Sequence, residues 1–163
     1  MRSFVRTLEK IQTVFVGFLL AVLLVVVSLQ VWTRFVSYKP LMWTEEVARF
    51  SLVWIVFQGA AIAVQRKAHY ILDILPARLS QKTRRILSLL CCLFMFAMAY
   101  VIVYHGWVFA VSGLRRLSPT VELPMFWVYL AIPTSGICMM IYIIGHVLEL
   151  LSVGIPVQQR EDV

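Results

Sequence analysis

Two acids and an arginine stand at the start of an apolar stretch, and these residues are the best suited in the chain to do chemistry. Glu45 and Glu46 are followed by Arg49, four residues after the first acid and three after the second. On a helix this spacing allows an ion pair along one face. The apolar part that follows, 50–64, holds fifteen residues. It would cover only about 22 Å as a helix, whereas a bilayer core is roughly 30 Å thick.

If this stretch spans a membrane, its three charges lie at or just inside the boundary, where ionisable groups need partners. Part of the acidity has a simpler origin, because Thr44 can cap a helix and the helix dipole favours acids in the first turn. Arg34 ends the preceding apolar run, and the connection between the two helices is short. We therefore also expect Arg34 as an ion-pair partner between helix 1 and helix 2.

Apolar runs dictate the fold class. The chain is 61% hydrophobic, and three runs without charge, 11–33, 86–114 and 123–148, each exceed the roughly 18 residues of a spanning helix. With the stretch from Trp43, they predict an all-α integral membrane protein with four transmembrane helices in one domain. The expected elements are helix 1 at about 11–36, helix 2 at 43–66, a short amphipathic interfacial segment at 69–83, helix 3 at 86–112, helix 4 at 124–151 and a polar tail at 157–163.

The net charge of +7 is unevenly distributed along this plan. Ten basic residues fall before helix 1, between helices 2 and 3 and in the tail, and four fall in the opposite connections. By the positive-inside rule both termini are cytoplasmic. Membrane lipid headgroups are the expected partners of these basic residues, and nucleic acid is not.

Motifs of soluble enzymes are absent. The sequence has no phosphate-binding glycine loop, no HExxH and no GxSxG. Its three cysteines form no CxxC pair and fall within predicted spans, where they act as small hydrophobes. We expect no enzyme activity, no cofactor, no metal site and no catalytic or substrate-binding residue. Gly59 and Ala63 instead have the spacing that lets a second helix approach closely.

The residues of the second stretch also resemble a known family. Trp43, Glu45, Glu46 and Arg49, then Trp54, Gly59 and His69, are similar to the signature of the small, DctQ-like membrane subunit of tripartite ATP-independent periplasmic (TRAP) transporters. The region from Glu122 through Trp127 and Tyr129 to Pro133 is similar to the pattern before and within that family's last helix. The resemblance covers nearly the whole chain.

This resemblance implies sodium-driven uptake of an organic acid across the bacterial inner membrane. It implies two protein partners: a large TRAP membrane subunit, which holds the substrate and sodium sites, and a periplasmic substrate-binding protein. The residues expected at the subunit interface are Trp43, Glu45, Glu46, Arg49, Gly59, Ala63 and His69. Two alternatives stay open: a haem- or quinone-associated membrane anchor of an oxidoreductase, and a small homodimeric exporter coupled to protons.

Overall fold

The described part of the chain is almost entirely helical. The computed structural model describes residues 2–36, 41–74 and 81–152. Its elements are α1 (Arg2–Phe35), α2 (Met42–Ile74), α3 (Gln81–Ser112), the 3-10 helix η1 (Gly113–Arg115), α4 (Phe126–Tyr129) and α5 (Ala131–Ser152). Four stretches are long and apolar enough to cross a membrane: Phe4–Phe35, Met42–Arg66, Ile86–Arg115 and Phe126–Leu148. The predicted fold class, an all-α protein with four transmembrane helices, is confirmed.

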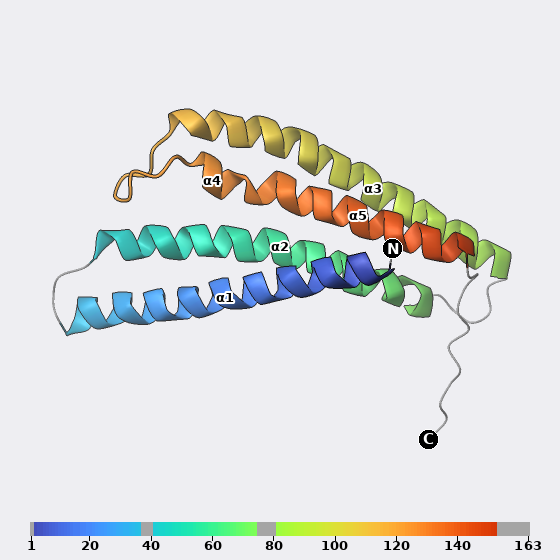
Figure 1. Cartoon of the computed structure of the whole chain (residues 1–163), viewed down its shortest axis with the longest axis horizontal. Helices are drawn as coiled ribbons and strands as arrows, with labels where there is room; N and C mark the ends of the chain where they lie inside the picture. The colour runs from blue at the N-terminus through green and yellow to red at the C-terminus, as the bar shows by residue number, and fades with distance from the viewer. Residues whose placement is uncertain (1, 37–40, 75–80, 153–163) are drawn as a thin grey trace, which may run out of the picture.

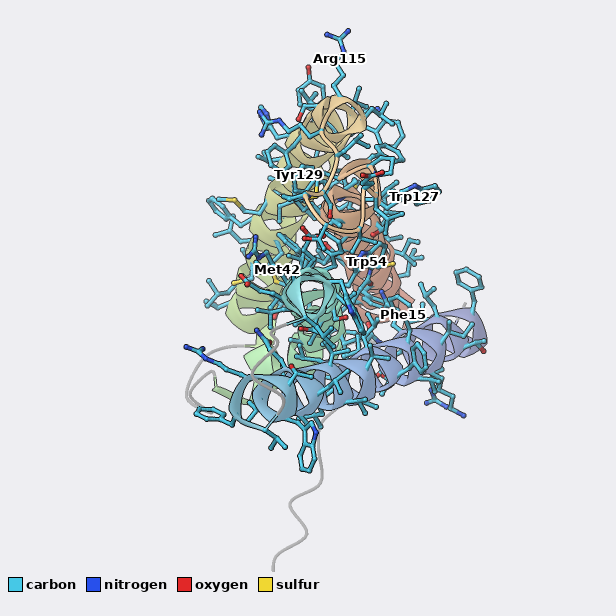
Figure 2. All side chains as sticks on the ribbon, turned by 90° about the vertical axis from the view of Figure 1, so that its left-hand side faces the viewer. Phe15, Met42, Trp54, Arg115, Trp127 and Tyr129 are labelled. Atoms are coloured by element: carbon cyan, nitrogen blue, oxygen red, sulfur yellow. The ribbon has the colours of Figure 1, made fainter. Side chains whose placement is uncertain are left out.

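The four long helices form a single row, one helix thick. Along the row the order is α1, α2, α5, α3, because the last helix returns between α2 and α3 (Figure 1). Two antiparallel hairpins result, α1 with α2 and α3 with α4–α5, and they meet along α2 and α5. We call the end with the start of α2 and the 113–125 connection the loop end, and the opposite end the terminal end. Figure 2 views the row from the loop end.

Two helices extend further than the sequence pattern predicted. Residues 69–74 continue α2 and residues 81–83 begin α3, so the described parts of the predicted segment at 69–83 are continuous with these two helices, and their position at the membrane interface stays a prediction. Residues 75–80 and the predicted tail at 157–163 lie outside the described residues. The reason is local: no proline or glycine interrupts the sequence from residue 60 to 75, and Pro76 is the first residue to disfavour a helix before it. Likewise α1 begins at Arg2 rather than near residue 11.

The predicted fourth helix is divided. Its first turn, α4, is separated from α5 at Leu130, three residues before the buried Pro133. Proline has no N–H to donate to the carbonyl four residues earlier, and this weakens a helix at that point. A close contact between α3 and α5 lies beside this proline. A Cβ added to Gly106 would come 2.7 Å from the Ile132 side chain, and one added to Gly136 would come 2.7 Å from Val103. Small residues thus bring α3 and α5 together.

Candidate assembly site

Glu46 ties the start of α2 to the connection that follows α3. Its side chain is buried, with 7% of the residue exposed. The carboxylate accepts hydrogen bonds from the Ser118 hydroxyl and from the backbone N–H groups of Thr120 and Val121, the latter two at 2.9 and 3.0 Å. Charge-assisted bonds of this kind are the stronger ones in proteins. One acid therefore fixes a segment more than 70 residues away in the sequence, and we call this contact the Glu46 clasp.

The connection held by the clasp has a defined shape of its own. Leu117 and Pro124 form an isolated antiparallel bridge, in which the Ser118 N–H donates to the Leu123 carbonyl at 2.9 Å. Glu122 turns the chain with a φ of 53°, a conformation uncommon outside glycine. The backbone turn points two successive N–H groups at Glu46, and such a concave arrangement of donors suits an anion. The loop end is thus built around a carboxylate.

Glu45 and Arg49 lie on a different face of α2. Glu45 Oε1 and Arg49 Nη2 are 2.7 Å apart, and their side chains are 61% and 64% exposed. This is the ion pair within one helix that the spacing allows. Arg34, at the exposed end of α1, bonds to neither acid, because Glu45 is paired with Arg49 and Glu46 with the clasp. The predicted ion pair between helices 1 and 2 is not formed among the described residues.

The remaining predicted residues do not converge on one point. Trp43 is exposed at the loop end. A Cβ on Gly59 would meet no atom of another element within 4 Å among the described residues, so this position is open. Ala63, one turn further along α2, is partly exposed. His69 lies in the last part of α2, and its side chain is outside the described ones. The predicted set therefore divides between a clasp inside the subunit and a free face of α2.

A buried chain of hydrogen bonds in the middle of the row was not predicted. The Tyr142 hydroxyl donates to Gln12 Oε1, Gln12 Nε2 donates to Gln58 Oε1 at 2.7 Å, and Gln58 Nε2 donates to the Thr134 hydroxyl at 3.2 Å. These four residues come from α1, α2 and α5, and we call them the amide network. Polar side chains commonly join helices within membranes. The signal for this network in the sequence is the presence of the amides Gln12 and Gln58 within largely apolar runs.

A third polar contact lies toward the terminal end, where Arg66 Nε is 3.2 Å from Glu9 Oε1. The clasp and the amide network join the two hairpins, and the ion pair of Arg66 with Glu9 holds α1 to α2 within the first hairpin. Among the described residues, no group of three or more His, Cys, Asp or Glu side chains is placed to hold a metal ion. These contacts hold the helices in place. The polar groups that form them are hydrogen-bonded or ion-paired with one another.

Comparison with known proteins identifies the family. Residues 23–153 match the family of the DctQ component of tripartite ATP-independent periplasmic transporters. The chain is 26% identical over 137 residues to a TRAP transporter small permease protein of Haemophilus influenzae, covering 84% of this chain and 85% of that one. It is 26% identical over 152 residues to the sialic acid TRAP transporter small permease protein SiaQ of Vibrio cholerae, covering 93% and 86%.

A third relative is much longer. The chain is 26% identical over 117 residues to the sialic acid TRAP transporter permease protein SiaT of Haemophilus influenzae, covering 68% of this chain and 18% of that one. These matches, with four helices able to span a membrane, show a multi-pass inner-membrane protein. They favour neither the oxidoreductase anchor nor the exporter that the sequence left open. This chain belongs to the DctQ family, the small permease subunits of TRAP transporters.

Proposed function

We propose that this chain supports sodium-driven uptake of an organic acid by packing against a large permease subunit and helping to dock a periplasmic binding protein. The substrate and sodium sites then belong to the large subunit. The observation that carries this role is the single row of helices. Phe126–Leu148 is the span that the rest of the chain buries most, yet only 39% of its apolar 18-residue window is buried. A single row of helices suits a subunit that packs against a larger membrane protein.

The relatives support the identity of this larger protein. SiaT contains a region similar to this chain within a permease polypeptide more than five times as long as the matched part. When two proteins occur as one polypeptide in a relative, separate chains of the same family are expected to lie side by side. The large permease subunit is therefore the proposed partner of this chain.

We place the loop end in the periplasm. The positive-inside rule puts the side with ten basic residues in the cytoplasm and the side with four in the periplasm. The loop end then faces the binding protein. Arg115 and Arg116 are exposed there, and Arg115 projects away from the helices in Figure 2. Together with the exposed Arg34, they place three basic side chains at the loop end, beside the exposed Glu122. These arginines would suit an acidic patch on the binding protein.

The Glu46 clasp makes the loop at the proposed docking surface more rigid. A loop that is already ordered loses less conformational entropy when a partner binds to it. The Glu46 clasp orders the segment from Ser118 to Val121, directly beside the two arginines. An organic acid is the proposed substrate because the relatives SiaQ and SiaT are named for sialic acid, which is a carboxylate.

Reconstitution tests this proposal. Proteoliposomes containing this chain and the large subunit, with the binding protein added outside, are given an inward sodium gradient and a radiolabelled carboxylate bound by that binding protein. We expect uptake that requires all three proteins and collapses without the gradient. Undiminished uptake by the large subunit without this chain would contradict the proposed role. Uptake driven equally well without sodium would contradict the proposed coupling.

A further inference from the structure

One face of α2 carries a regular stripe of residues that the other described helices leave at least partly exposed. Its positions are separated alternately by three and four residues, the spacing by which one helix packs lengthwise on another. We call this stripe the α2 seam; its residues are Met42, Glu45, Arg49, Leu52, Val56, Gly59, Ala63 and Arg66. Val56 near its middle is 57% exposed.

The opposite face of the same helix is already occupied. Thr44, Ser51 and Gln58 follow one another at intervals of seven residues and are all buried, and Ala61 on the same side is fully buried. Gln58 bonds to α1 and α5 from this side. Apart from Arg66, which bonds to Glu9 of α1, the α2 seam therefore points away from the rest of the subunit and toward whatever surrounds it in the membrane.

The charges on the α2 seam make lipid an unsuitable neighbour. Arg49 and Arg66 are seventeen residues apart, which corresponds to about 26 Å along a helix. With Arg66 at one boundary of a core roughly 30 Å thick, Arg49 lies inside the opposite boundary. Ionisable groups within the core of a membrane face protein or water-filled cavities and have partners. The exposed pair of Glu45 and Arg49 thus calls for a protein surface with a matching polar group.

We propose that a transmembrane helix of the large permease subunit lies along the α2 seam. This helix places a bulky apolar side chain in the gap above Gly59 and Ala63, and a hydrogen-bonding or charged group at the depth of Glu45 and Arg49. The inference rests on the proposed function, since it names the face used for the proposed assembly. A second copy of this chain would satisfy the same geometry, and the experiments separate the two occupants.

Position-specific photo-crosslinking locates the occupant. A benzophenone-bearing residue replaces Val56 on the α2 seam or, as the control, the 67% exposed Val25 on α1, outside the α2 seam. After illumination of membranes containing the whole transporter, we expect an adduct with the large subunit from position 56 and none from position 25. An adduct of the chain with itself, or equal adducts from both positions, would overturn the proposal.

A pair of glycine substitutions tests the gap. Gly59→Leu fills the α2 seam, whereas Gly17→Leu adds the same side chain on α1. A Cβ added at either glycine meets no atom of another described element within 4 Å, so both substitutions start from open positions, and the helical circular dichroism of each variant checks that it still folds. Overpacking at a closed interface should reduce co-purification of the large subunit about tenfold or more for Gly59→Leu alone. Equal recovery with both variants would overturn the α2 seam while leaving the proposed function standing. Failure of the unaltered chain to recover a large subunit would instead contradict the proposed function.

Discussion

Replacing Gln58 by leucine isolates the contribution of the amide network. Leucine has nearly the volume of glutamine, so packing changes little, but both hydrogen bonds of Gln58 disappear. Interhelical hydrogen bonds in membranes are worth about 0.6 kcal/mol each on average. The Gln12 amide, which belongs to a residue only 6% exposed, also loses its acceptor, and stranding a buried polar group costs about 1–3 kcal/mol. We expect Gln58→Leu to lower the free energy of unfolding by about 2–4 kcal/mol.

The measurement is reversible unfolding in mixed micelles, followed by the helical circular dichroism signal as the denaturing detergent increases. Gln30→Leu is the matched control, since Gln30 is a partly exposed glutamine on α1 that takes no part in the network. It should leave the free energy of unfolding nearly unchanged or raise it, because leucine suits the membrane better.

A double-mutant cycle then tests the direct contact. If Gln12 and Gln58 bond to each other, the variant with both residues replaced by leucine strands fewer partners than the single variants together. Its loss should fall short of the sum of the two single losses by about 1 kcal/mol, since residues in contact couple by 0.5–3 kcal/mol. Strict additivity, or a Gln58→Leu protein as stable as the Gln30→Leu control, would refute the reasoning.

Three further predictions concern the other contacts. Glu46→Ala should release the 118–121 segment and make trypsin cleave the neighbouring loop severalfold faster, whereas Glu45→Ala should not; equal cleavage would show that the clasp does not order the loop. Gly106→Ala places a Cβ 2.7 Å from a side chain of α5 and should lower the free energy of unfolding by about 1–3 kcal/mol in the same assay. The control, Gly17→Ala, should be neutral or stabilising. Equal effects of the two substitutions would contradict the close contact between α3 and α5. Arg66→Ala breaks an ion pair whose arginine is 61% exposed, and its effect should stay below about 1 kcal/mol; a larger loss would mean that this contact is desolvated.

Fold class followed from the sequence because an apolar run of spanning length has few alternatives in a membrane. Helix ends were harder. The described part of α2 continues past Arg66 to Ile74, so the change from apolar to polar residues near Arg66 does not end the helix. The break between α4 and α5 at Leu130 agrees with the presence of Pro133 in the sequence, because the missing N–H is a property of the proline residue itself.

The candidate site was predictable only in part, since its contacts join distant segments. Burial and ionisable type pointed to Glu46, but its partners lie more than 70 residues away in a loop whose turn is defined by the φ of Glu122. Gln12 lies between Ile11 and Thr13 at the start of an apolar run, and nothing in the local sequence indicates that it bonds to Gln58 on α2. The small residues Gly59 and Ala63 predict close approach by a second helix, and this stays a prediction, because a Cβ on Gly59 meets no described atom within 4 Å. Nothing in the local sequence shows that α5 packs on the other side of α2.

The central claim is that this chain is one part of a larger permease. The most direct test is the mass of the particle recovered when the affinity-tagged chain is extracted from its own membrane in a mild detergent and measured by native mass spectrometry. The account predicts one species in which this chain and a much larger multi-helix permease subunit occur in a fixed ratio. A particle containing only this chain, whether single or paired with itself, would contradict it.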